Sequence, residues 1–230
     1  MKRFYKLVTV DASDSSLRIL LDGKPIRTPA KSVLSPPTTA LANAIAEEWR
    51  AQEQSVIPDS MPLTQFTNAA IDMVSTRRAE IVESVAAYAG SELLCYRAES
   101  PSELIERQRR HWQPLLDWAA LRFDALMTVY SGVMPHPQPP EALRSLRAAV
   151  EALDVWRLTA LHVMVGACGS LVVGLALLEG RISPDEAFAF SELDESYQIE
   201  FWGEDLEATK RRTRLRRDLT AVRRFVDLLS

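Results

Sequence analysis

The side chains best suited to acid–base chemistry are carboxylates near the C-terminal end of this 230-residue sequence. Asp194 and Glu195 are adjacent and Glu192 precedes them, and with His162 they include the groups that a proton-transfer site needs. Adjacent residues of a helix point in different directions, so this spacing does not by itself imply cooperating carboxylates. An enzyme of unrecognised class that uses Asp194 and Glu195 is therefore one alternative.

Other catalytic and metal-binding patterns are missing from the sequence. It contains no glycine-rich phosphate loop, no G-x-S-x-G turn and no H-E-x-x-H motif. His111 and His136 stand in separate contexts, and Cys95 and Cys168 lie far apart without a ligand cluster. We therefore expect a protein without catalytic residues, cofactor or metal, in which both thiols are buried as small apolar side chains.

The charge pattern after residue 178 is more unusual. Ten acids lie between Glu179 and Glu207 against Arg181 alone, and six bases follow between Lys210 and Arg217. One interpretation is a solvated surface with i,i+4 pairs such as Glu207 with Arg211. The other is a surface that selects a charged partner. Nucleic acid is not the expected partner, because no aromatic residues interleave with the bases and the net charge is −4.

The elements that must position these residues change in kind along the chain. Apolar runs at 4–10, 17–21 and 24–28 predict strands, and Asp22-Gly23 between two of them predicts a two-residue hairpin turn. After Pro37, Leu41, Ile45 and Trp49 follow a helical period on one face, and helices are expected from there onward. The prediction is an α+β fold, with a small β-rich N-terminal domain (1–60) and a larger all-helical C-terminal domain (61–230).

Capping signals mark two of the expected helices. Ser183-Pro184-Asp185-Glu186 and Ser100-Pro101-Ser102-Glu103 both predict a capping box with Pro in the first turn. Pro114 is expected to kink or divide the helix that follows the second of these motifs.

The stretch 158–178 has no formal charge and is just long enough to span a bilayer. It also contains a histidine and three glycines, which suits the buried central helix of a bundle better. The prediction is a central helix with its small residues at a close contact, where Gly166→Leu would overpack the core. A membrane-associated assembly factor is the second alternative.

Several segments in a fixed order resemble one family, the assembly chaperones of the ATP synthase α-subunit in mitochondria and α-proteobacteria. The segments that carry this resemblance are Arg3 to Lys6, Leu21 to Pro29, Leu41 to Trp49, Met61 to Thr64, Ala70 to Asp72, Leu94 to Arg97, Leu193 to Glu195 and Gln198 to Asp205.

The resemblance implies a chaperone that binds the free α-subunit of the F-type ATP synthase, promotes assembly of the catalytic head and catalyses nothing itself. It also ties function to a C-terminal acidic segment, and the partner-binding residues predicted here are Glu195, Gln198, Trp202, Glu204, Asp205 and Glu207. Whether Trp49 and Trp202 belong to the core or to an interface stays open. With no apolar or amphipathic leader in the sequence, the bacterial cytoplasm is expected, against the mitochondrial matrix for eukaryotic relatives. The oligomeric state is open, with a monomer as the expectation.

Overall fold

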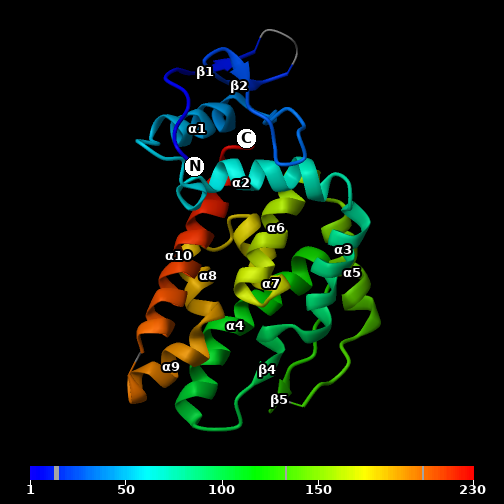
Figure 1. Ribbon diagram of the computed structural model, residues 1–230. Coiled ribbons are helices and arrows are strands. Elements are labelled where there is room, and N and C mark those ends of the chain that lie inside the picture. Colours follow the sequence, from blue (N-terminus) through cyan, green and yellow to red (C-terminus); the bar gives the residue numbers. More distant parts are fainter. Residues whose placement is uncertain (13–15, 133, 204) are drawn as a thin grey trace. The chain divides into compact units, whose positions relative to one another are not determined.

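Short strands come first along the chain and helices follow, as the computed structural model shows for residues 1–12, 16–132, 134–203 and 205–230 (Figure 1). The strands are β1 (Val8–Asp11), β2 (Arg18–Leu21), β3 (Lys24–Pro25), β4 (Tyr96–Arg97) and β5 (Tyr130–Ser131). The α-helices are α1 (Thr39–Arg50), α2 (Pro62–Ala69), α3 (Arg78–Ala86), α4 (Ser102–Phe123), α5 (Pro140–Glu151), α6 (Val155–Cys168), α7 (Leu171–Leu178), α8 (Pro184–Ser191), α9 (Leu193–Trp202) and α10 (Leu206–Asp227). The predicted α+β class is confirmed.

The chain divides into two compact units. The first consists of Met1–Arg78, Val155–Ala160 and Ala221–Ser230, and the second of Ala79–Asp154 and Leu161–Thr220. Both α6 and α10 therefore contribute residues to each unit. The two domains predicted from the sequence, 1–60 and 61–230, stay a prediction.

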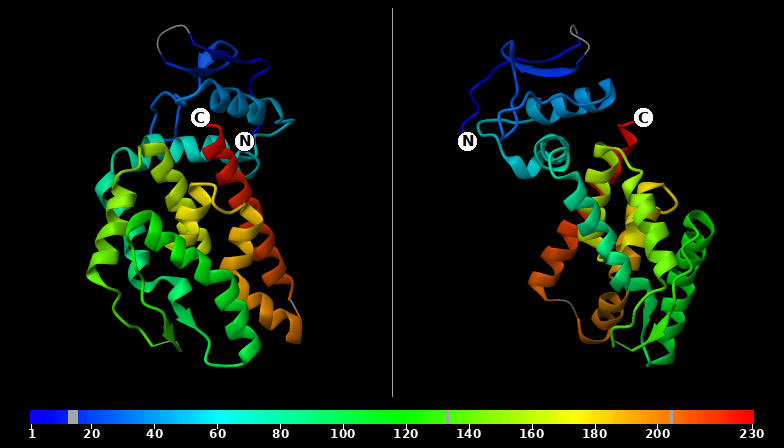
Figure 2. Two further views of the ribbon diagram at one scale, coloured as in Figure 1. Left: turned by 180° about the vertical axis from the view of Figure 1, so that it is seen from behind. Right: turned by 90° about the vertical axis from the view of Figure 1, so that its right-hand side faces the viewer.

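The first unit is built on an antiparallel sheet in the order β1-β2-β3. The predicted turn is confirmed, because Leu21 pairs with Lys24 while Asp22 and Gly23 take φ values of 48° and 80°. α1 packs across this sheet (Figure 2) and buries Leu41 and Ile45 completely. The periodicity of the sequence thus predicted which side of α1 faces the core.

The second unit has its core around α7, in which all eight residues are buried. α7 packs against α4 and α8, and the short strands β4 and β5 pair in parallel at Tyr96 and Tyr130. The capping box at Ser183 is confirmed. The one predicted at Ser100 is wrong, because α4 begins at Ser102 without a side-chain cap. Of the two outcomes expected at Pro114, a kink or a division, the division does not occur, since α4 continues through this residue.

The charge-free stretch 158–178 is not one helix, which corrects the sequence prediction. α6 ends at Cys168, Gly169 adopts a positive φ of 66°, and Ser170 caps α7 with its side chain. Leu158 and Leu161 at one end and Leu177 at the other are fully buried, so the stretch does occupy the core. Gly166 is exposed and makes no close helix contact, contrary to expectation.

Candidate functional site

The turn between α9 and α10 brings most of the predicted partner-binding residues together in the second unit. Glu195, Gln198, Trp202 and Asp205 line a shallow surface hollow of about 400 Å³, together with Ile199, Gly203 and Ala208. Glu207 is exposed on the first turn of α10 but does not line the hollow. Glu204 lies outside the described residues.

Local sequence explains the shape of this turn. Gly203 ends α9 with a φ of 78°, a conformation that residues with a side chain rarely adopt. Asp205 Oδ1 then accepts the backbone N–H groups of Glu207 and Ala208, both at 2.8 Å. These are the donors that an N-cap satisfies, so Asp205 has a structural task at the start of α10.

The carboxylates around the turn are largely occupied by arginines. Glu192 bonds Arg211 at 2.5 Å and Arg212 at 3.1 Å, and Arg211 also pairs with Glu195. The hydrogen bonds that Arg211 donates to Glu192 and then to Glu195 raise the pKa of Arg211 above its usual value. On the other side of α9, Glu200 bonds Arg107 at 2.5 Å.

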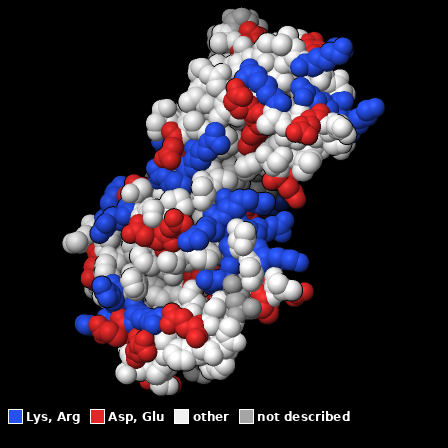
Figure 3. All heavy atoms as spheres, turned by 90° about the vertical axis from the view of Figure 1, so that its left-hand side faces the viewer, with Lys and Arg blue, Asp and Glu red and all other residues white. Residues whose placement is uncertain are grey.

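Ion pairs with arginines break up the acidic segment that the sequence shows. The face in Figure 3 carries basic and acidic side chains next to one another rather than a continuous acidic surface. Charge reversal at Glu195 would break an internal pair with Arg211, and reversal at Asp205 would remove a helix cap. Glu195 and Asp205 are therefore already engaged within the second unit.

Exposed apolar side chains are the second feature of this turn. Phe201 is 60% exposed, while Trp202 and Leu206 are each 79% exposed. The Phe201 ring packs on Tyr197 with centroids 5.0 Å apart and lies 6.3 Å from the Trp202 ring. Large apolar groups with a charged border are typical of protein-binding surfaces. Trp202 thus lies outside the core.

A family model described as ATP12 chaperone protein matches residues 2–120. The chain belongs to the ATP12 chaperone family. It is 41% identical to Atp12 from Paracoccus denitrificans, whose crystal structure matches with a TM-score of 0.95 over 100% of this chain and 98% of that one. The Atu1473 protein of Agrobacterium tumefaciens is 40% identical, with a TM-score of 0.94 over 100% of this chain and 86% of that one. The mitochondrial protein atp12 of Schizosaccharomyces pombe is 26% identical over 214 residues, which cover 88% of this chain and 74% of that protein.

Membership in the ATP12 chaperone family confirms the resemblance found in the sequence and makes the chain a molecular chaperone. The carboxylates of the enzyme alternative, Asp194 and Glu195, are engaged separately. Asp194 accepts a hydrogen bond from Gln108 at 2.8 Å, and Glu195 is paired with Arg211. Burial lowers the pKa of His162, with no carboxylate contributing to the shift.

The possible metal ligands and the two thiols of this ATP12 chaperone can be considered in the same way. Within 1–12, 16–132, 134–203 and 205–230, no three His, Cys, Asp or Glu residues gather as metal ligands. Burial raises the pKa of both Cys95 and Cys168 to about 12. Over the same residues, no helix has the length and apolar character that crossing a membrane requires.

Sequence reasoning missed Phe201 and Leu206 as members of the site. Phe201 stands at helical spacing from Leu193 and Tyr197, a pattern that is typical of a buried stripe. A signal that could have found Phe201 is the neighbouring pair Phe201-Trp202, because adjacent side chains leave a helix about 100° apart and so extend beyond one narrow apolar stripe.

Proposed function

We propose that this ATP12-family chaperone holds the free α-subunit of the F-type ATP synthase head until that subunit meets its β partner. Family membership over more than half of the chain is the observation that carries the proposal. The proposal includes action by binding alone, without catalysis or cofactor, as a monomer in the bacterial cytoplasm.

The surface that the client, the free α-subunit, would expose is suited to the turn between α9 and α10. An α-subunit without its partner exposes a surface meant for β, and such apolar surface promotes aggregation. A chaperone must cover that surface and later release it. Phe201, Trp202 and Leu206 offer apolar anchors, while the paired charges beside them favour specificity over raw affinity.

The anchors, rather than the acids, are expected to carry most of the binding free energy. Buried aromatic anchors at interfaces contribute more than exposed charge pairs, which are screened by water and salt. Glu195 and Asp205 are therefore proposed to shape and border the site, because Arg211 and the start of α10 already use their carboxylates.

Co-expression with the α-subunit of the same bacterium, followed by pull-down, tests the proposal. The wild-type chain should capture the α-subunit and keep it soluble. Trp202→Ser with Leu206→Ser should weaken capture by about tenfold or more, which corresponds to about 1.4 kcal/mol. Both residues are exposed, so stability should change by less than about 0.5 kcal/mol.

Leu121→Ser is the matched control, because Leu121 is 89% exposed on α4 of the same unit and does not line the hollow. Glu207→Lys tests the charged border without removing the Asp205 cap, and its effect should shrink between about 50 mM and about 500 mM salt. A wild-type chain that captures no α-subunit contradicts the proposed function. Full capture by the folded Trp202/Leu206 variant removes this turn from the binding site.

A further inference from the structure

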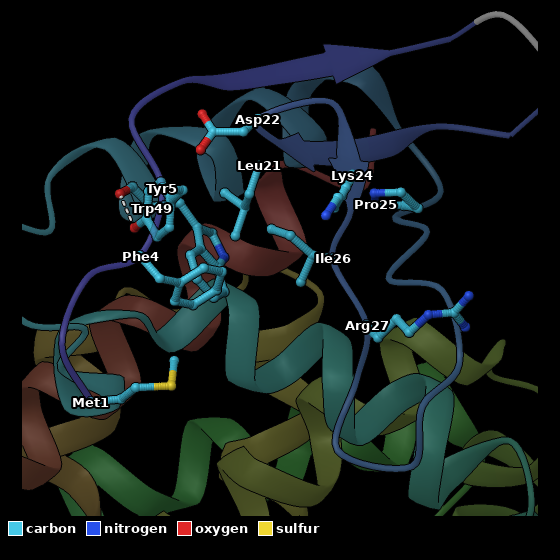
Figure 4. Close-up of a pocket in the computed structure, with 10 residues that line it drawn as sticks. All are labelled: Met1, Phe4, Tyr5, Leu21, Asp22, Lys24, Pro25, Ile26, Arg27 and Trp49. Carbon is cyan, nitrogen blue, oxygen red and sulfur yellow. Dashed lines mark hydrogen bonds between the residues drawn. The ribbon is translucent and has the colours of Figure 1, made fainter.

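The first unit contains a second hollow, separate in residues from the turn between α9 and α10. Its volume is about 480 Å³, and its walls come from the segment before β1, from the hairpin around β2 and β3, and from the end of α1 (Figure 4). Small-molecule and peptide side-chain sites commonly have volumes in this range. None of the sequence patterns discussed above predicted it.

Apolar side chains form most of this hollow. Leu21, Ile26 and Trp49 are buried in its wall, whereas Phe4 and Met1 are 64% and 73% exposed. Large apolar side chains exposed to water at the mouth of a hollow are unfavourable in free energy. They therefore favour a binding site that an apolar group of another molecule covers.

Most polar groups in the wall are already bonded within the unit. Tyr5 Oη donates to the carbonyl oxygen of Trp49 at 2.7 Å. The Asp22 carboxylate accepts the N–H groups of Lys6 and Leu7, the latter at 2.8 Å. These backbone hydrogen bonds lower the pKa of Asp22, the one from Leu7 by the larger amount, and keep its carboxylate ionised.

The Trp49 indole is the exception. Trp49 is only 9% exposed, and the Nε1 atom of its indole has no hydrogen-bond partner among the described residues. Figure 4 shows the indole beside Leu21 and Ile26, with its nitrogen on the side of the hollow where Ile26 lies. A buried donor without an acceptor costs free energy, and Nε1 itself has almost no accessible surface in this structure. An acceptor in the hollow would therefore gain from this N–H once the side chains of the wall shift to uncover it.

Positive charge borders the apolar walls. Lys24 and Arg27 both line the hollow. Residues 1–31 contain seven Lys or Arg and three Asp, in a chain whose net charge is −4. This local excess favours a carboxylate-bearing partner over a basic one.

We propose that the hollow binds an extended segment of the client protein in which a large apolar side chain stands next to carboxylates. The inference rests on the proposed function, because it makes the hollow a second contact for the same client. The apolar side chain fills the space beside Phe4 and Ile26. A carbonyl or carboxylate oxygen of the segment accepts the Trp49 N–H, and its carboxylates face Lys24 and Arg27.

A labelled peptide tests the site without the whole client. The probe is an acetylated peptide Asp-Glu-Leu-Phe-Glu-Asp, compared with Lys-Lys-Leu-Phe-Lys-Lys and Asp-Glu-Ser-Ser-Glu-Asp, in fluorescence anisotropy with the full chain. Only the first should bind, and its binding should weaken between about 50 mM and about 500 mM salt. In the ¹H–¹⁵N spectrum one of the five indole N–H peaks, assigned through Trp49→Phe, should shift when this peptide binds.

Matched double variants locate the binding. Phe4→Ser with Lys24→Glu should weaken peptide binding by about tenfold or more. Leu7→Ser with Lys31→Glu should leave it unchanged, because Leu7 is also exposed and neither residue lines the hollow. Trp49→Phe keeps an aromatic side chain but loses the N–H together with the second ring of the indole, so binding should weaken by about threefold to tenfold.

Capture of the α-subunit separates this inference from the proposed function. If the Phe4/Lys24 variant captures the client like the wild type and the peptide does not bind the wild type, the inference is overturned while the proposed function stands. If the wild type binds the peptide but captures no α-subunit, the proposed function fails and the peptide site stands. If the molecular mass of the wild type in solution rises with concentration while the Phe4/Lys24 variant stays monomeric, the hollow binds a second copy of this chain. That result overturns the proposal that it binds a client segment.

Discussion

Trp49 and Trp202 both stand at the end of a helix and follow glutamates in the sequence, yet their environments are opposite. Trp49 is 9% exposed beneath the hairpin of the first unit, whereas Trp202 is 79% exposed at the end of α9. The difference depends on what covers each helix end. The β2–β3 hairpin contributes Leu21 and Ile26 beside Trp49, while α10 leads away from Trp202 after the Gly203 turn.

Two glycines of the charge-free stretch also differ in what surrounds them. A Cβ added at Gly174 would lie 2.8 Å from Cγ2 of Val165 and 3.2 Å from Cδ1 of Leu161, whereas one added at Gly166 would meet nothing within 4 Å. Val165 is β-branched and moves little, so the contact at Gly174 cannot be relieved without cost. The close approach predicted for Gly166 is therefore found at Gly174.

Paired alanine substitutions test this difference. Both variants gain the helix propensity that glycine lacks, about 1 kcal/mol, so their comparison isolates the packing. We expect Gly174→Ala to be less stable than Gly166→Ala by about 1–3 kcal/mol in urea unfolding, because it overpacks the core of the second unit. Equal stability of the two variants would show that α7 relaxes freely away from Val165.

At the scale of elements, the start of α7 depends on a residue far away in the sequence. The Glu92 carboxylate, fully buried, accepts the N–H groups of Leu171 at 2.9 Å and Val172 at 3.1 Å and also bonds Ser170 Oγ. A helix start buried in the core leaves backbone donors that need acceptors, and the carboxylate also suits the positive end of the helix dipole. A stretch without charge thus takes its helix-capping carboxyl group from elsewhere in the chain.

Removal of that carboxylate is expected to be among the most destabilising single changes in the second unit. Glu92→Ala leaves the buried N–H groups of Leu171 and Val172 without acceptors, at about 1–3 kcal/mol for each group. The unfolding free energy should fall by about 3 kcal/mol or more in urea titrations. Glu83→Ala on α3 serves as the control, because Glu83 is exposed and pairs only at the surface with Arg147.

The same residue gives the stability a defined pH dependence. Burial raises the pKa of Glu92 above its ordinary 4.5, so in this range the folded state holds a proton that the unfolded state has released. Stability from this group is then greatest at low pH and decreases as pH rises from 4.5 through the raised pKa. Glu92→Gln cannot titrate, and the difference in unfolding free energy between it and the wild type should change in that direction across the window. A difference independent of pH would place the Glu92 pKa at its ordinary value.

At the scale of the whole molecule, both ends of the chain belong to the first unit. Thr38 donates its hydroxyl to the carbonyl of Leu228 at 2.5 Å, and Phe225, fully buried, packs on Phe66 with ring centroids 5.5 Å apart. Val222 is fully buried as well. The last turns of α10 thus complete a core that the strands and α1 begin.

Truncation tests how much that completion matters. A chain ending at residue 220 loses Val222, Phe225 and Val226, each with a cost of about 2–5 kcal/mol for a large buried side chain. We expect its first unit to be unfolded, seen as loss of protection in hydrogen exchange over residues 1–60, and we expect the fragment 1–60 to be unfolded when expressed alone. A folded fragment would instead support the 1–60 domain predicted from the sequence. Removal of residue 230 alone, which is exposed, is the control and should leave protection unchanged.

The sequence alone determined the features that depend on neighbours along the chain. Asp22-Gly23 specified its hairpin turn because two successive positive φ angles favour these residue types, and Leu41, Ile45 and Trp49 specified the buried face of α1 through helical periodicity. The ordered segments from Arg3 to Asp205 also sufficed for the family. The Ser100 cap failed because Pro101, whose side chain cannot accept a hydrogen bond, takes the N-cap position of α4 in place of Ser100.

Only the tertiary structure decided which side chains are free to bind. The sequence shows Glu195 and Asp205 as acids of one segment, but Arg211 and the backbone of α10 occupy them once the helices pack. It shows Phe201 as part of an apolar stripe, although no described element buries it. The hollow beside Trp49 is formed by segments up to 48 positions apart, from Met1 to Trp49. Burial and pairing depend on contacts between distant segments, and a periodic pattern along one element does not contain them.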